Sequence, residues 1–199
     1  MTASWQIRPE EPGDADAVYA LDNEVFGPGR FAKSAYRLRE GVAPVRELAF
    51  VAIENGEPVG SVRFWPVIVG QAPSLLLGPL AVRQELRGRG IGIDLMRTGI
   101  EKARRLGCDS IVLVGDEPYY GRVGFAMLPR GTVRFPGPVD PARILGLALE
   151  DGALEKLHGD VRRARIDEPV CAAGAPLGAA NVQDTTRRPS RSARVMPRS

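Results

Sequence analysis

Histidine and cysteine are scarce in this chain of 199 residues, which contains one histidine and two cysteines. Cys108 and Cys171 have neither metal-ligand spacing nor the number expected of a disulfide framework, and His158 has no second histidine near it. A Ser-His-Asp triad would have to use His158, but no nucleophile-elbow motif accompanies it. The sequence therefore predicts no metal site, no hydrolytic triad and no disulfide, and it favours a reduced, cytoplasmic setting.

Long hydrophobic runs are also missing. The most apolar stretch, residues 67–80, is interrupted by Gly70, Gln71, Pro73 and Ser74, so it is unlike a segment that spans a bilayer. The first residues lack the basic and then apolar order of a signal peptide. A hydrophobic fraction of 44% is ordinary for a globular protein, and the length suits one domain with a real core. We therefore expect no membrane segment.

Positive charge is concentrated in the last part of the sequence. Residues 169–199 contain five arginines and one aspartate and so carry a charge of +4. The whole chain carries +3, so residues 1–168 carry about −1. The last segment is rich in Ala, Gly, Pro, Ser and Arg and poor in large apolar residues, so we predict a domain over 1–168 and a disordered tail over 169–199. Nucleic-acid binding is disfavoured because the tail has no aromatic residue for base stacking and the body is nearly neutral.

Hydrophobic periodicity and turn residues divide the body into two parts. The first part is predicted to hold two helices and an antiparallel meander, and the second a β-α-β unit followed by short strands. The expected helices cover residues 14–26, with Asp14 as the N-cap, 31–39, 91–106 and a short turn after Asp116. The expected strands cover residues 5–8, 48–53, 58–69, 75–82, 110–114 and 144–149, with another beginning at Gly124. This order indicates an α/β (α+β) domain with a mixed sheet.

A glycine-rich loop, Arg87-Gly88-Arg89-Gly90-Ile91-Gly92, joins an expected strand to an expected helix. Glycine allows positive φ angles that turn successive N–H groups to one side, and the helix N-terminus and the two arginines add positive potential. The loop is therefore suited to bind a pyrophosphate, although a tight packing turn is an alternative. A dinucleotide fingerprint would need glycine where Ile93 stands, and a P-loop would need a Lys-Ser or Lys-Thr pair that is missing.

Two motifs in the right order give this sequence a family resemblance. Val82-x4-Arg87-x2-Gly90-x-Gly92 resembles the cofactor motif of the GNAT superfamily of N-acetyltransferases, and Tyr120-Gly121-Arg122-Val123-Gly124-Phe125 resembles a second family motif about thirty residues later. Residues 77–82 and 115–120 are similar to an uncharacterised bacterial branch of predicted acetyltransferases. The resemblance covers about residues 5 to 165. It implies the GNAT acyl-CoA N-acyltransferase fold, an antiparallel meander followed by a β-α-β cofactor unit.

The resemblance also implies a reaction and a set of site residues. Acetyl-CoA would be the cosubstrate, without a metal, and a primary amine would attack its thioester directly, without an acyl-enzyme. The phenol of Tyr120 occupies the family position for protonating the departing thiolate, although its ring could simply pack. By position, the backbone of Leu80, Ala81 and Val82 would pair with the pantetheine arm. The phosphates would be bound by the amides of Arg87, Gly88, Arg89, Gly90, Ile91 and Gly92.

The acceptor and the general base stay open at this stage. Glu24, Glu47 and Asp116 are candidate bases through water, although Asp116 is better explained as a helix cap. The acceptor could be a small-molecule amine or a protein amine, bound near Val25, Phe26, Phe31, Tyr36 and Trp65 if these are not simply core. Members of the family frequently form homodimers. The alternative function is a non-catalytic acyl-CoA-binding or regulatory domain that keeps the loop and lacks turnover.

Overall fold

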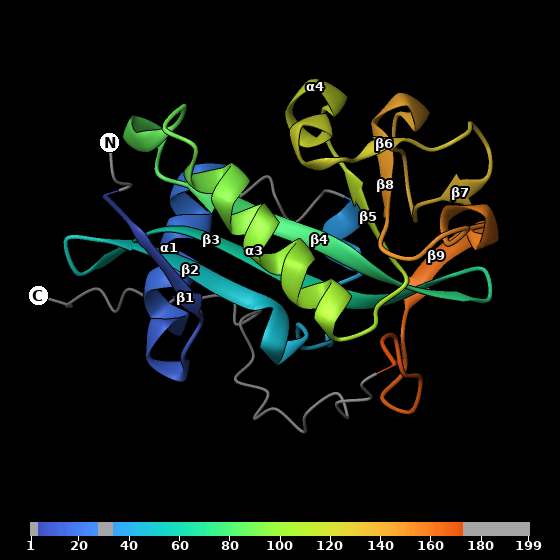
Figure 1. Ribbon diagram of the computed structural model, residues 1–199, viewed down its shortest axis with the longest axis horizontal. Helices are drawn as coiled ribbons and strands as arrows, with labels where there is room; N and C mark the ends of the chain where they lie inside the picture. Colours follow the sequence, from blue (N-terminus) through green and yellow to red (C-terminus); the bar gives the residue numbers. More distant parts are fainter. Residues whose placement is uncertain (1–3, 28–33, 173–199) are drawn as a thin grey trace, which may run out of the picture.

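A computed structural model of the protein describes residues 4–27 and 34–172, and Figure 1 shows its arrangement. A long twisted sheet forms the centre of the molecule. Its strands follow the order β1-β2-β3-β4-β5-β8-β6, and all neighbours on this path are antiparallel except β4 and β5, which are parallel. The bounds are β1 (Gln6–Pro9), β2 (Ala49–Glu54), β3 (Glu57–Val69), β4 (Ala72–Val82), β5 (Ser110–Val114), β8 (Ile144–Ala148) and β6 (Ala126–Met127).

The predicted antiparallel meander followed by a β-α-β unit is confirmed. Strands β2 and β3 form a hairpin at Asn55-Gly56, whose φ angles of 53° and 84° are those that a tight primed turn requires. Strand β5 is buried on both faces, as its continuous apolar run predicts, because Ile111 and Val112 belong to different core clusters. Two short strands were not predicted. These are β9 (Gly159–Arg163), which pairs with the far end of β3, and β7 (Val133–Arg134), which pairs with β9.

Helices cover both faces of the β1–β4 part of the sheet. In Figure 1, α3 (Ile91–Arg105) crosses the front of the strands, and α1 (Ala15–Phe26) lies behind them. Helix α3 approaches β3 so closely that a Cβ on Gly99 would lie 2.3 Å from a ring atom of Phe64. The contact explains why glycine stands in the middle of a helix, where it costs about 1 kcal/mol relative to alanine.

The second predicted helix is shorter than expected. Residues 28–33 lie outside the described part, so its predicted start is not tested, and the observed helix α2 is Ser34–Arg37. The N–H group of Arg39 donates to the carbonyl of Tyr36, which turns the chain out of the helix. The predicted extension to residue 39 is therefore wrong. Leu38 is buried in the second core cluster and fixes this turn against the sheet.

A disulfide joins Cys108 to Cys171 across a sequence separation of 63 residues. The prediction of no disulfide is therefore wrong, and the argument for a reduced setting loses its basis. Next to the bridge, the N–H group of Ala172 donates to the carbonyl of Gly107 at 2.9 Å, and Val170 is buried in the core. The packed chain thus continues past the predicted boundary at residue 168, while residues 173–199 of the expected tail lie outside the described part. Within residues 4–27 and 34–172, every helix is too short or too polar to cross a bilayer.

Candidate functional site

The glycine loop forms an open surface at the N-terminus of α3. Gly88 and Gly90 have φ angles of 83° and 104°, which favour glycine, and a Cβ at either position would meet nothing within 4 Å. Within the described part of the chain, the N–H groups of Gly88, Arg89 and Gly90 donate no backbone hydrogen bond. Free amides beside a helix N-terminus attract anions, because the helix dipole adds to the partial charges of the N–H groups.

Gly92 is needed for a different reason. A Cβ at this position would lie 2.3 Å from the hydroxyl oxygen of Tyr119, so the phenol occupies the space over the first turn of α3. Burial raises the pKa of the Tyr119 phenol, which therefore stays protonated at neutral pH. The sequence did not connect Tyr119 with the loop. Only the folded chain, in which α4 (Glu117–Tyr120) lies against α3, brings Tyr119 and Gly92 together.

The two arginines of the loop differ in their surroundings. The guanidinium of Arg89 forms an ion pair with Glu54 at 2.8 Å and lies 5.4 Å from the centre of the Trp5 ring. Its charge is thus directed toward β2 and holds the pKa of Glu54 below its usual value. The positive potential that the sequence led us to expect from Arg89 is therefore partly offset by Glu54. Arg87 is exposed and forms no ion pair with a described residue, so its charge is available to a ligand.

A gap opens between β4 and β5 beside this loop. The two strands pair only at Leu75↔Ile111 and Leu76↔Val112, although β4 continues to Val82 and β5 to Val114. On its other edge β4 stays paired with β3 to its end. The backbone of Leu80, Ala81 and Val82 is therefore held in place by β3, while the edge that faces β5 has no strand partner. An extended ligand can pair with such an edge.

Tyr120 lies at the end of α4, just after β5. Its ring packs on Gly115, where a Cβ would lie 2.3 Å from a ring carbon, and it contacts Phe125 edge-on at 6.1 Å between ring centres. Burial raises the pKa of Tyr120 to about 12, although the charges of Arg39 and Arg143 act in the opposite direction. The phenol therefore keeps its proton at neutral pH. It can donate a hydrogen bond to a developing negative charge.

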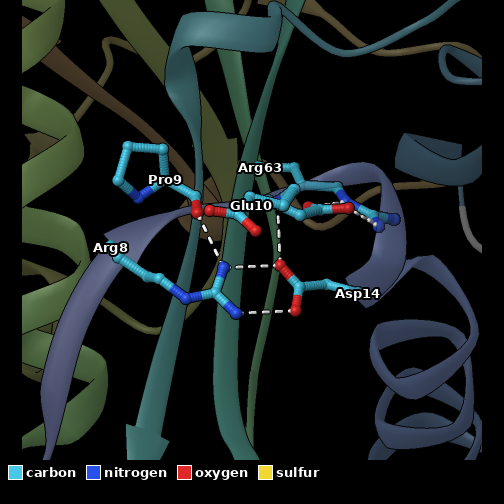
Figure 2. Close-up of polar contacts among 6 residues, drawn as sticks. Arg8, Pro9, Glu10, Asp14 and Arg63 are labelled. Carbon is cyan, nitrogen blue, oxygen red and sulfur yellow. Dashed lines mark hydrogen bonds and ion pairs between the residues drawn. The ribbon is translucent and has the colours of Figure 1, made fainter.

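Charged side chains gather on the sheet face opposite α3, and Figure 2 shows the part next to β1. Arg63 donates two hydrogen bonds to Glu10, Nε to Oε2 at 2.7 Å and Nη2 to Oε1 at 2.5 Å. Arg8 binds Asp14 in the same way, at 2.6 Å and 2.8 Å, and Asp14 also accepts from the N–H group of Glu11. Pairing of this kind offsets much of the cost of removing these charges from water.

Sequence reasoning missed two charged residues of this face, Asp22 and Arg39. Asp22 is only 7% exposed, and its charge acts on both Arg39 and Arg63. The helical period pointed to its neighbour Leu21 as the inward residue and gave no reason to bury a carboxylate beside it.

The structure places the candidate bases on the surface. Glu24 and Glu47 are exposed, and Asp116 is exposed and pairs with Arg143 at 3.1 Å. Asp116 stands at the N-cap position of α4 as expected, but its side chain makes no capping hydrogen bond. His158 is exposed too, and no group of three metal-ligating side chains occurs among the described residues.

Comparison with known proteins agrees with this geometry. The acetyltransferase (GNAT) family model matches residues 15–125. The uncharacterized N-acetyltransferase YjhQ of Escherichia coli strain K12 is 34% identical over 119 residues, which cover 58% of this chain and 66% of YjhQ. YhbS of the same strain, also an uncharacterized N-acetyltransferase, is 31% identical over 156 residues, which cover 77% of this chain and 92% of YhbS.

Two solved structures are similar in fold and sequence. The crystal structure of Escherichia coli YhbS in complex with CoA has a TM-score of 0.71 and 29% identity, and the match covers 82% of this chain and 92% of that one. A GNAT family acetyltransferase from Brucella melitensis in complex with acetyl-CoA has a TM-score of 0.62 and 29% identity, with coverage of 80% and 96%.

Proposed function

Because this chain belongs to the acetyltransferase (GNAT) family, we propose that it transfers an acetyl group from acetyl-CoA to a primary amine. The observation that carries the proposal is the gap between β4 and β5, which opens beside a glycine loop with free amides. The gap suits an extended chain such as the pantetheine arm, and the loop suits a pyrophosphate. Coenzyme A contains both of these parts. CoA and acetyl-CoA are the ligands of the two similar crystal structures, which supports the same ligand here.

The described residues fit this ligand in three places. The open space at Gly88 and Gly90 leaves room for phosphates against the backbone, and Arg87 adds an available positive charge. The free edge of Leu80, Ala81 and Val82 offers backbone groups to the amides of the pantetheine arm and to the thioester carbonyl. Backbone donors held in place by β3 can polarise a carbonyl without reorganising during the reaction.

The acetyl thioester supplies the activated acyl group, and the chain positions the reacting partners. The neutral amine nitrogen bonds to the carbonyl carbon, the C–S bond breaks, the nitrogen loses a proton, and the sulfur gains one. Tyr120 is protonated at neutral pH and is proposed to donate its phenol proton toward the sulfur. Its pKa of about 12 lies above that of an ordinary thiol, about 8.5, so Tyr120 favours a hydrogen bond to the sulfur over complete proton transfer. Solvent then takes up the proton lost by the nitrogen and supplies the proton that the thiolate gains.

Calorimetric titration with acetyl-CoA tests the proposal. Gly90→Glu places a carboxylate in the loop, where it would occupy the phosphate site and repel the phosphates, so binding should weaken at least about 100-fold. Gly131→Glu is the matched control, because Gly131 also has a positive φ, of 83°, and open space around its Cβ position, but lies in the loop between β6 and β7. The control should bind acetyl-CoA like the wild type.

Three outcomes are informative. Binding by the wild type and the control, together with thiol release in the presence of small amines or protein amines, supports the transferase. Binding without thiol release from any amine favours the alternative, a non-catalytic acyl-CoA-binding domain. A folded wild type that does not bind acetyl-CoA contradicts both, and the glycine loop is then a packing turn.

A further inference from the structure

The guanidinium of Arg39 lies at the gap between β4 and β5. Its Nη2 atom would be 3.0 Å from a Cβ on Gly78, a residue of β4 just beyond the last pair with β5. Its charge also acts on Tyr120, which follows β5. Leu38, buried in the core, fixes the turn that carries Arg39. The guanidinium is therefore held near the proposed proton donor, on the sheet face opposite α3.

Arg39 lacks the partner that such a buried charge normally has. Its Nε atom is buried without a hydrogen-bond partner among the described residues, and Asp22 acts on it only through its charge. Burial therefore lowers the pKa of Arg39 to about 10. Arg63 shows the opposite case on the same face, since Glu10 binds it through two hydrogen bonds and raises its pKa despite burial. Two arginines of one cluster thus differ in how a carboxylate meets them, because Glu10 binds Arg63 through hydrogen bonds whereas Asp22 acts on Arg39 through its charge alone.

A second unpartnered donor lies on this face of the sheet. The indole Nε1 of Trp65 is buried and has no hydrogen-bond partner among the described residues. Trp65 pairs with Leu76 in the register of β3 and β4, two residues before Gly78, and packs against the same core cluster as Leu38. Guanidinium and indole nitrogens only donate hydrogen bonds, so their missing partner must be an acceptor.

We propose that Arg39, with Trp65, binds a carboxylate of the acceptor substrate, so that the acetylated amine belongs to an amino-acid-like molecule. The inference deepens the proposed function and rests on it. A carboxylate accepts two parallel hydrogen bonds from a guanidinium and fixes the orientation of the molecule that carries it. The amine of the same molecule is then directed toward the gap, where the acetyl group is proposed to lie.

The charge of the cluster favours a carboxylate over a phosphate. Among the described residues, Asp22 acts on both Arg39 and Arg63, and Glu10 acts on Arg63, so these four side chains have formal charges that sum to zero. A molecule with one ammonium and one carboxylate leaves this balance unchanged. An amine that carries a phosphate adds net negative charge, and a simple amine adds positive charge, both at a cost in a poorly solvated site.

Matched substrate pairs test the inference on the full-length protein. Glycine, β-alanine and 4-aminobutyrate are each compared with the corresponding carboxamide, and 2-aminoethyl phosphate represents the phosphate-bearing amines. Thiol release gives kcat/KM for each compound. At least one acid should exceed its amide by roughly 10- to 100-fold, the range expected for hydrogen bonds to a charged group. Equal values for all acids and amides, or a preference for 2-aminoethyl phosphate, overturn the inference.

Variants connect the preference to Arg39. Arg39→Gln should lower kcat/KM much more for each acid than for its amide, and so remove the preference for the acid. If the variant acted through the pKa of Tyr120 instead, acid and amide would lose activity equally, which would contradict a binding role. If Arg39→Gln does not fold, Arg39→Lys replaces it in the test. This variant keeps the charge and should retain part of the preference for the acid. Trp65→Phe should reduce the preference less, and the exposed Arg37→Gln is the control that should not change it.

Binding measurements keep this test separate from that of the proposed function. Calorimetry of the three acids and their amides on the CoA-saturated protein reports the carboxylate site without turnover. If acetyl-CoA binds and amines are acetylated, but no acid binds more tightly than its amide, the transferase stands and the carboxylate site is rejected. If acetyl-CoA does not bind at all, the proposed function fails first.

Discussion

The side proposed to bind the cofactor and the sheet face opposite α3 are built from different groups. The cofactor side consists mainly of backbone, with the left-handed glycines 88 and 90, the first amides of α3 and the free edge of β4. The opposite face consists of charged side chains from distant parts of the sequence, such as Arg63 and Glu10, 53 residues apart. Backbone groups bind a ligand that every member of a family shares. Side chains can differ from one family member to the next, so they can determine which acceptor each member binds.

Replacing Tyr120 has the largest expected effect, because it removes the one side chain proposed to act on the thiolate. Tyr120→Phe keeps the ring against Gly115 and Phe125 but loses the hydrogen bond from the hydroxyl to the developing thiolate, so kcat should fall by roughly 10²- to 10³-fold. Acetyl-CoA affinity should stay within about twofold, because the backbone-built side is unchanged. Steady-state kinetics and calorimetry measure the two quantities.

The pH dependence provides a further check on Tyr120. Its raised pKa of about 12 means that the protonated form persists well above neutral pH, so the wild-type rate should not fall from tyrosine ionisation below about pH 10. A Tyr120→Phe variant with wild-type turnover would show that the ring only packs. The cofactor side would then act without a side-chain acid.

Removing the disulfide has the next largest effect, on stability. The bridge closes a long loop and holds the last described residues against the C-terminal end of α3. Cys171→Ser, or reduction of the wild type, should lower the free energy of unfolding by about 2–4 kcal/mol, measured by urea denaturation. Acetyl-CoA binding should persist because the glycine loop lies at the other end of α3. An unchanged unfolding midpoint after reduction would mean that the bridge does not constrain the chain in solution.

The contrast between local backbone features and side-chain pairs from distant parts of the chain also explains how much the sequence could predict. The GNAT membership is confirmed, and the hairpin at Asn55-Gly56, the glycine loop and β5 were found because each is encoded in a few consecutive residues. The Cys108–Cys171 pair, the contact of Tyr119 with Gly92 and the approach of Arg39 to Gly78 depend on the folded chain. No short sequence pattern predicts such pairs. The pairing of Arg89 with Glu54 was not predicted for the same reason, since Glu54 is 35 residues away.

The smallest predicted effect is the response to acid of the charge pairs on the sheet face opposite α3. The hydrogen bond from Arg8 is the main reason why the pKa of Asp14 lies below its ordinary value of 3.8. The folded state therefore favours the ionised carboxylate. This stability is complete above the unfolded pKa and is lost as the pH falls through the lowered, folded pKa. As the pH falls below about 3.8, the wild type should therefore lose stability more steeply than Arg8→Gln, by no more than about 1 kcal/mol.

Denaturant unfolding at several pH values measures this difference. Arg134→Gln is the control, because the pair of Arg134 with Asp160 has a similar distance of 2.7 Å but both side chains are largely exposed, so the pair should contribute little. If Arg8→Gln follows the wild type at every pH, the pair in Figure 2 is screened like a surface pair. Arg8 and Asp14 would then contribute little to the stability of the face opposite α3.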